Sequence, residues 1–136
     1  MDIRKIAAED TWPIRHKVMW PDRAIDYIKL DMDSDGIHYG LFEDESLISA
    51  ISLFVNGEKM QFRKFATLES EQGHGYGTKL LSFVIDVAID MKIKVLWCNA
   101  RANKTEFYER FSLVKTDKTF EKGGKQYVIM ERILNE

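Results

Sequence analysis

The chain has 136 residues, 45% hydrophobic and 31% charged, an ordinary composition for a globular protein with a buried core. Its 20 Lys and Arg and 22 Asp and Glu give a net charge of −2, without the basic patches of nucleic-acid-binding proteins. One cysteine excludes an internal disulfide, no signal-peptide layout opens the chain, and no apolar run approaches the ~20 residues of a membrane span. We therefore expect one cytoplasmic domain over residues 1–136 that binds neither nucleic acid nor membrane.

The N-terminal third predicts a strand, a helix and a turn. Ile3–Ile6 reads as a strand, and Asp10-Thr11 is a candidate N-cap for a helix that ends at Pro21. Ala24–Leu30 is compatible with a second helix. One apolar face is expected on the first helix, formed by Ile14, Val18 and Met19.

The acidic segment Asp31–Gly36 has two interpretations. Its D-x-D-x-D-G pattern opens a calcium-binding EF-hand loop, but the twelfth position, which needs a bidentate Glu, is Phe42. A solvated turn fits the segment better, and the aspartates of residues 22–35 could also attract a cationic amine.

Three strands should follow as an antiparallel meander: Ile37–Glu43, Leu47–Val55 and Lys59–Thr67. The last two are separated by Asn56-Gly57, a strong hairpin signal.

The second half predicts a helix between two strands. Apolar residues recur at helical spacing at Leu80, Leu81, Val84, Val87, Ala88 and Met91, and Lys79, Ser82, Asp86 and Asp90 share the polar face. Val95–Ala100 is a strand that the crossover makes parallel to Lys59–Thr67. A short helix over Asn103–Phe111 and a terminal strand pair, Leu113–Phe120 with Tyr127–Leu134, complete the chain.

The stretch Gln72–Leu81 carries three alternating glycines where the long helix begins. Glycine lets a ligand approach the main chain, and the free N–H groups of a helix start attract phosphates. The P-loop spacing fails because no Ser or Thr follows Lys79, and the dinucleotide fingerprint fails because Thr78 replaces its third glycine. The loop predicts an anionic, phosphate-bearing ligand, and it disfavours ATP or NAD.

The spacing Gln72-x-x-Gly75-x-Gly77 resembles the coenzyme A motif of the GNAT N-acetyltransferase superfamily. Arg63–Thr67 before it and Thr78–Leu81 after it extend the match. A second stretch, Asn103–Leu113, resembles that family's Asn-initiated Phe-Tyr helix, with Ser112-Leu113 where Gly-Phe is common. The resemblance implies a mixed α/β fold with antiparallel N-terminal strands, flanking helices and a central parallel pair splayed around the cofactor.

The resemblance also implies site residues. Acetyl-CoA would lie against the main chain of Phe65, Ala66 and Thr67, with its pyrophosphate on the loop formed by Gln72, Gly73, His74, Gly75, Tyr76, Gly77 and Thr78. Asn103 would contact the pantetheine or phosphate region, and Tyr108 would protonate the leaving thiolate. Without a ligand, Asn103 and Glu106 could form a capping box, and Tyr108 could be a half-buried aromatic. We expect His74 to face solvent, Cys98 to lie in the core, and no metal site.

The reaction implied by the resemblance is acetyl transfer to a primary amine through a tetrahedral intermediate. A main-chain N–H near Ala66–Thr67 would polarise the acetyl carbonyl. Lys59–Thr67 contains no carboxylate to serve as base, Glu69 and Glu71 lie in the loop, and a water-relayed base is expected. The acceptor stays open between a small-molecule and a peptide amine, and dimers are common among relatives. The alternative is a non-catalytic acyl-CoA-binding sensor or regulatory module.

Overall fold

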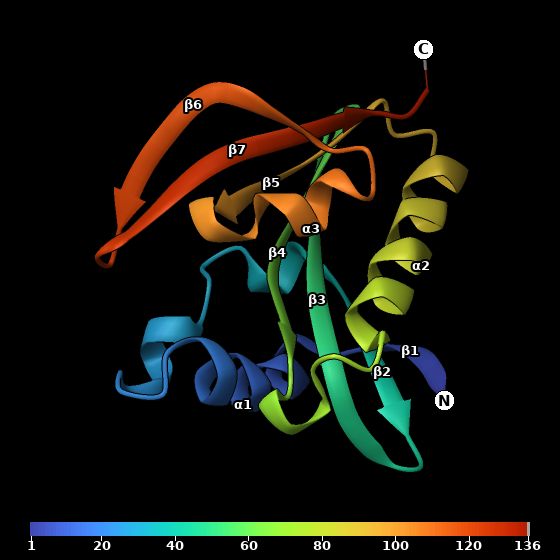
Figure 1. The fold of residues 1–136 in the computed structure, drawn as a ribbon. Helices are drawn as coiled ribbons and strands as arrows, with labels where there is room; N and C mark the ends of the chain where they lie inside the picture. The colour runs from blue at the N-terminus through green and yellow to red at the C-terminus, as the bar shows by residue number, and fades with distance from the viewer. Residues whose placement is uncertain (136) are drawn as a thin grey trace. The chain divides into compact units, whose positions relative to one another are not determined.

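The computed structural model describes residues 1–135 as a mixed α/β fold (Figure 1). The strands form one sheet in the order β1-β2-β3-β4-β5-β7-β6. The strands are β1 (Asp2–Ile6), β2 (Ile37–Glu43), β3 (Ser46–Asn56), β4 (Lys59–Thr67), β5 (Val95–Arg101), β6 (Val114–Lys122) and β7 (Lys125–Ile133). The α-helices of the described residues are α1 (Ala8–Met19), α2 (Tyr76–Asp90) and α3 (Thr105–Glu109). The expected fold class is confirmed.

The chain divides into two compact units. The first unit comprises Met1–Phe54 and Phe62–Val84, and the second comprises Val55–Gln61 and Ile85–Glu136. Strand β4 and helix α2 each contribute residues to both. The organisation of residues 1–136 as one domain stays a prediction.

The expected meander comprises β2, β3 and β4: β2 pairs antiparallel with β3, and β4 follows β3 in the sheet. Strand β1 pairs with β2 from Asp2 opposite Phe42 to Ile6 opposite His38. The β2–β3 register shifts between Leu41 and Phe42. The bounds of β2 and β4 agree with the sequence prediction, and β3 is one residue longer at each end.

Helix α1 begins at Ala8, so the predicted start at Asp10-Thr11 is wrong. Asp10 is the third residue of the helix, and its carboxylate accepts a hydrogen bond from the Ala7 N–H at 3.0 Å. An acidic residue in the first turn interacts favourably with the helix dipole. Asp is common both there and at the N-cap, so Asp10 resembled a cap in the sequence. The stretch Ala24–Leu30 contains only the short 3₁₀ helix Ile25–Ile28.

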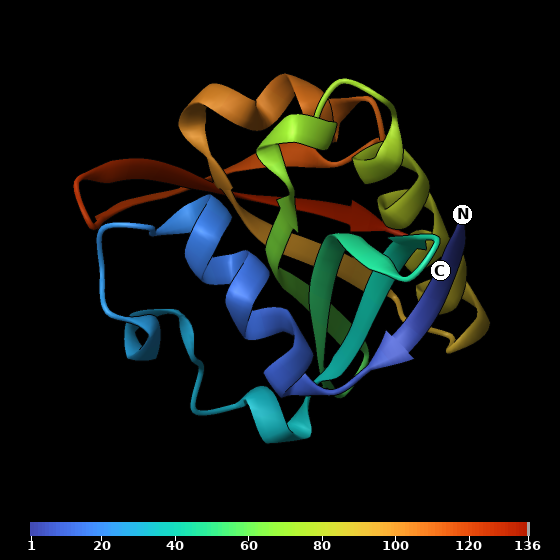
Figure 2. The same cartoon turned by 90° about the horizontal axis from the view of Figure 1, so that it is seen from below.

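The predicted apolar face of α1 is confirmed. Ile14 lies in a buried cluster with Ala50 of β3 and Ala66 of β4. Val18 and Met19 pack against this cluster, and Figure 2 shows α1 running beside these strands. The first unit therefore buries the end of β4 between α1 and β3.

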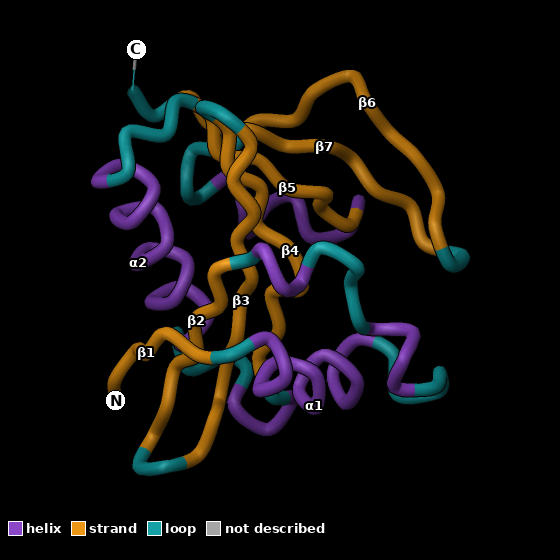
Figure 3. Tube along the Cα trace, turned by 180° about the vertical axis from the view of Figure 1, so that it is seen from behind, coloured by secondary structure: helices purple, strands orange, loops and turns teal. Residues whose placement is uncertain are grey.

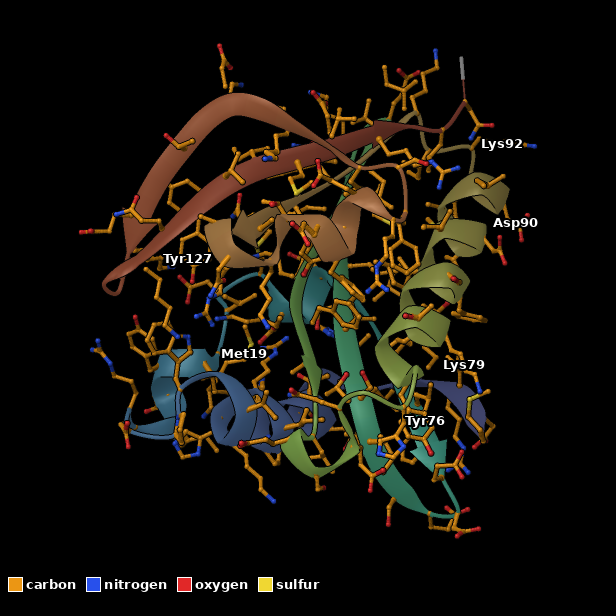
Figure 4. All side chains as sticks on the ribbon, in the orientation of Figure 1. Met19, Tyr76, Lys79, Asp90, Lys92 and Tyr127 are labelled. Carbon is orange, nitrogen blue, oxygen red and sulfur yellow. The ribbon has the colours of Figure 1, made fainter. Side chains whose placement is uncertain are left out.

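Helix α2 is amphipathic as expected. Leu80, Leu81, Val84 and Ala88 have no exposed surface, and the polar positions Lys79, Ser82, Asp86 and Asp90 are exposed. The placement of Met91 on the apolar face is wrong: Met91 follows the last helical residue and is 43% exposed. The chain leaves the helix there through Lys92, which has φ 63° (Figure 4 labels Asp90 and Lys92).

The second unit contains the predicted parallel strand pairing. Strand β5 runs parallel to β4, pairing Val95–Trp97 with Lys59–Gln61, and β7 pairs antiparallel with both β5 and β6. Gly123 and Gly124 have φ values of 60° and 80°, as a two-residue hairpin turn requires. Figure 3 shows the β6–β7 hairpin extending beyond the end of β5. Over residues 1–135 the structure has no helix long and apolar enough to cross a membrane.

Candidate active site

The end of β4 carries Phe65-Ala66-Thr67, the main chain expected to meet the cofactor. Lys64, immediately before it, has φ 54° inside the strand, a left-handed conformation that costs a non-glycine residue about 1–2 kcal/mol. Such strain in a strand redirects the main chain and is typical of functional sites. The positive φ of Lys64 therefore shows where β4 departs from regular strand geometry.

Buried Ser49 of β3 fixes the orientation of this strand end. Its hydroxyl donates to the Ala66 carbonyl at 3.0 Å and lies 2.9 Å from Thr67 Oγ1. Since the Ser49 proton is used on the carbonyl, the Thr67 hydroxyl is the donor in the second bond. The Leu68 N–H also donates to the Ile48 carbonyl at 2.9 Å. Ser49 is not among the site residues expected from the sequence, although a serine within the apolar run of β3 was a usable signal.

The glycine loop leaves its main chain open. Gly73 and Gly75 have φ values of 85° and 82°, and a Cβ built at either would meet no atom within 4 Å. Both positions therefore need glycine for their conformation, and both leave room for a ligand to approach. Gly77 differs, because its Cβ would lie 3.4 Å from Phe65 Cζ and 3.5 Å from Thr67 Oγ1. Gly77 lets the start of α2 lie close to the end of β4.

Gln72 closes the loop. Its side-chain Nε2 donates to the Thr67 carbonyl at 3.0 Å, and its main-chain N–H donates to the Glu69 carbonyl at 3.3 Å. Because this N–H is already used inside the turn, the donors left for an anion begin after Gln72. Within the expected phosphate-binding set Gln72–Thr78, the main-chain N–H of Gln72 therefore stabilises the loop and is not available to a phosphate.

The start of α2 supplies those donors. Lys79 makes the first hydrogen bond of the helix, from its N–H to the Gly75 carbonyl at 3.1 Å, so the N–H groups of Tyr76, Gly77 and Thr78 precede the helical ladder. They lie at the positive end of a 15-residue helix (Figure 4 labels Tyr76 and Lys79). His74 is exposed, as expected, with its ring centroid 6.2 Å from that of Tyr76. The residues present fit a pyrophosphate group.

Asn103 and Tyr108 lie in the second unit. Asn103 is exposed in the 3₁₀ turn Ala102–Lys104, which leads into α3. The capping box with Glu106 does not form, because Lys104 is the N-cap of α3 and no side chain caps the helix. Ser112, where the sequence resemblance leads us to expect glycine, has φ 65°. Glycine adopts this conformation freely, so the turn is strained with serine there.

Tyr108 is a half-buried ring that packs edge-on against Phe107, with 5.2 Å between centroids. Burial, and secondarily the nearby Cys98 thiol, raises the pKa of the Tyr108 phenol, so it stays protonated at neutral pH. Cys98 is buried in β5, as expected, and burial raises the pKa of its thiol to about 12. Such a thiol is a core residue and not a nucleophile.

The interpretation of the acidic segment as a solvated turn is wrong at Asp33. Its carboxylate is 5% exposed and accepts two hydrogen bonds from Arg15, each of 2.8 Å. The Trp12 indole and the Leu30 N–H donate to the same carboxylate at 3.1 and 3.0 Å. Burial raises the pKa of Asp33, but these hydrogen bonds and the Arg15 charge outweigh burial and lower the pKa to about 2. Asp33 is thus a structural anion whose charge is paired with Arg15.

The network extends from Arg15 to His38. Arg15 is fully buried and also donates to the Ile28 carbonyl at 3.1 Å and to Ser52 Oγ at 2.8 Å, and its Nε alone has no partner among the described residues. His38 Nε2 lies 2.9 Å from the Asp33 carbonyl, and its Nδ1 lies 2.7 Å from Ser52 Oγ. Because a carbonyl only accepts, Nε2 is the donor in the contact with Asp33. Within residues 1–135 no group of three or more His, Cys, Asp or Glu could hold a metal ion.

The structure thus brings Phe65, Thr67, Gln72 and Gly77 together in the first unit. Asn103 and Tyr108 accompany Cys98 in the second unit.

Comparisons with known proteins identify the family and the fold. The model of the acetyltransferase (GNAT) family matches residues 2–112. The chain is 26% identical to the uncharacterized N-acetyltransferase YitI of Bacillus subtilis, over 98% of this chain and 97% of that protein. A Lactobacillus plantarum protein assigned as an N-acetyltransferase has the same fold, with a TM-score of 0.86 and 20% identity over 98% and 99% of the two chains. A GNAT family acetyltransferase of Elizabethkingia anophelis, solved with acetyl-CoA bound, has a TM-score of 0.77 and 18% identity over 98% and 97%. The match over most of the chain shows that this protein belongs to the GNAT acetyltransferase family.

Proposed function

We propose that the chain is an acetyl-CoA-dependent N-acetyltransferase that transfers the acetyl group to a primary amine by direct attack. The observation that carries the proposal is the open main chain at Gly73 and Gly75, directly before α2, in a chain of the GNAT family. A helix start with free N–H groups and room for phosphates is what a coenzyme A pyrophosphate needs. The acetyl-CoA-bound relative supports the same choice of cosubstrate.

The first unit would hold most of the cosubstrate. The main-chain N–H groups of residues 73–78 would bind the pyrophosphate, and Phe65-Ala66-Thr67 would pair with the pantetheine arm. Ser49 holds the Ala66 carbonyl, so the main chain there is preorganised for its ligand. Asn103, exposed and not used as a cap, is free to serve as a further polar contact.

Acetyl-CoA supplies an activated acyl group and a thiolate leaving group. A main-chain N–H near Ala66–Thr67 would donate to the carbonyl oxygen as negative charge develops on it. Tyr108 would donate to the leaving sulfur. Ordinary pKa values of ~10 for a phenol and ~8.5 for a thiol make complete proton transfer uphill by about 2 kcal/mol, and the raised pKa of Tyr108 makes it harder still. We therefore assign Tyr108 the role of a hydrogen-bond donor that stabilises the thiolate, with water as the final proton source.

The acceptor is an amine whose identity the fold does not determine. Solved proteins with this fold include an aminoglycoside 6'-N-acetyltransferase and a spermidine N-acetyltransferase. The aspartates of residues 22–35 do not form a common cation site, because Asp33 is committed to Arg15 and Asp26 pairs with Lys29 at 2.9 Å. β4 offers no carboxylate base, so a water-relayed base is retained in the proposal.

Acetyl transfer to an amine panel, measured for the wild type and for Tyr108→Phe, tests the function. An enzyme should lose at least tenfold in kcat while acetyl-CoA binding is kept, since removing a donor of this kind costs about 10²–10³ in kcat at other sites. Phe107→Leu is the control, because it changes the neighbouring ring and keeps the hydroxyl. Acetyl-CoA binding without any transfer by the wild type would favour the acyl-CoA sensor instead.

A further inference from the structure

Arg63 of β4 is a half-buried guanidinium whose charge is not matched by a carboxylate. Its only hydrogen bond among residues 1–135 is from Nη1 to the sulfur of Met32, at 3.4 Å. A thioether is a weak acceptor, and a guanidinium has five N–H donors. No acidic side chain of the described residues lies within ion-pair distance of Arg63.

The acidic group whose charge acts on Arg63 is already paired with Arg15. Asp33 lies close enough for its charge to act on Arg63, but its two oxygens already accept four hydrogen bonds, two of them from Arg15. Three of these bonds fall on Oδ2 and one on Oδ1, and Arg15 engages both oxygens in a bidentate pair. Burial and the positive charge of Arg15 lower the pKa of Arg63, and Asp33 only partly offsets them. The group of three charges, Arg15, Asp33 and Arg63, is therefore one positive charge in excess.

Arg63 also lies close to the strand end at which the acceptor amine would attack. It lies two residues before Phe65, on the strand that would carry the pantetheine arm, and one residue before the strained Lys64. Two residues of a strand span about 6.6 Å, so the long Arg63 side chain has the reach to contact a small molecule whose amine is near Ala66. Met32, 37% exposed beside it, offers apolar surface next to the charge.

We propose that Arg63 determines acceptor specificity by binding a carboxylate of the acceptor, so that the substrate is a carboxylate-bearing amine such as an amino acid or a peptide. This inference rests on the acetyltransferase function proposed above. The planar guanidinium matches a carboxylate with two parallel hydrogen bonds. A single positive charge in excess suits a monoanion, whereas a phosphate dianion would leave negative charge unmatched.

The test uses matched pairs of amines, each an L-amino acid or dipeptide and its C-terminal amide, which keeps the amine and removes the negative charge. The wild type should acetylate members with a free carboxylate with kcat/KM roughly ten- to a hundred-fold above their amides, as expected for hydrogen bonds to a charged group. In Arg63→Gln the preference should fall to near unity, mainly through KM, and Arg63→Lys should retain part of it. Arg4→Gln is the control, because it removes the same charge from an exposed arginine paired with Asp2 and Glu45, and it should leave the preference unchanged.

The outcomes separate this inference from the function on which it rests. Each variant is first checked for folding and for acetyl-CoA binding by thermal unfolding. If the wild type binds acetyl-CoA but treats acids and amides alike, acetylates only amines without a carboxylate, or acetylates no member of the panel, the role of Arg63 is refuted and cosubstrate binding stands. A preference that survives in Arg63→Gln also refutes it. If the wild type does not bind acetyl-CoA, the proposed function itself fails.

Discussion

Replacing Asp33 with Asn should destabilise the protein far more than the same change at Asp35, two residues further along the same acidic turn. Asp33 accepts four hydrogen bonds and balances the charge of fully buried Arg15. Asn removes the negative charge, and its NH₂ group would face the N–H donors that now bind the carboxylate, which cannot accept from it. Leaving a buried charge without its partner costs about 3–5 kcal/mol, a large part of the 5–15 kcal/mol that stabilises a typical domain. Asp35 is exposed, so Asp35→Asn should change the free energy of unfolding by less than about 0.5 kcal/mol.

The same carboxylate makes stability depend on pH. The pKa of Asp33 is lowered from 3.8 to about 2 in the folded protein, which corresponds to about 2 kcal/mol. Because the folded pKa is the lower one, this contribution is complete above pH ~4 and is lost as the pH falls toward 2. The difference in free energy of unfolding between the wild type and Asp33→Asn should therefore become smaller as the pH falls over this range.

Urea unfolding followed by circular dichroism measures both effects. The double variant Arg15→Met with Asp33→Leu is a further comparison, because apolar residues replacing a whole buried ion pair are often tolerated; it should be more stable than Asp33→Asn alone. The reasoning would be refuted if Asp33→Asn were as stable as Asp35→Asn. It would also be refuted if the difference in free energy of unfolding between the wild type and Asp33→Asn did not become smaller in acid.

Three further predictions follow from single residues. Gly75→Ala should lower the free energy of unfolding by about 1–2 kcal/mol because φ is 82° there, whereas Gly77→Ala meets Phe65 only at 3.4 Å and should be tolerated; equal costs in urea unfolding would contradict this. Ser112→Gly should stabilise by about 0.5–1 kcal/mol in the same assay, since it relieves a φ of 65° at an exposed position; a loss of stability would contradict it. The Cys98 thiol, with its pKa raised to about 12, should be roughly one part in 10⁵ thiolate at pH 7 and react with a thiol reagent only in denaturant; rapid native labelling would show that the site is accessible.

The parts of the fold that depend on local pattern could be predicted from the sequence. The strand-like runs and the turn residues between them predicted the bounds of β2 and β4, with Asn56-Gly57 separating β3 from β4, and the helical spacing after the glycine loop predicted α2. The glycine loop itself was recognisable because positive φ at Gly73 and Gly75 is a local requirement of the chain.

Features that depend on distant pairing could not be predicted. Arg15 and Asp33 are 18 residues apart, and nothing in D-x-D-x-D distinguishes the buried middle aspartate from its exposed neighbours. The unmatched charge of Arg63 became visible only after the partners of Asp33 were known. Met91 fitted the helical spacing, but the helix had already ended at Asp90.

Thermal unfolding with acetyl-CoA, CoA, ATP and NAD, each titrated separately, tests the central claim most directly. At a hundred times its Kd a ligand stabilises the folded state by about 2.7 kcal/mol, a shift in Tm on the order of 10 °C for a chain of this size. The account predicts this shift with acetyl-CoA and CoA and none with ATP or NAD. No shift with either CoA species at millimolar concentration would contradict it and leave the glycine loop as a structural turn.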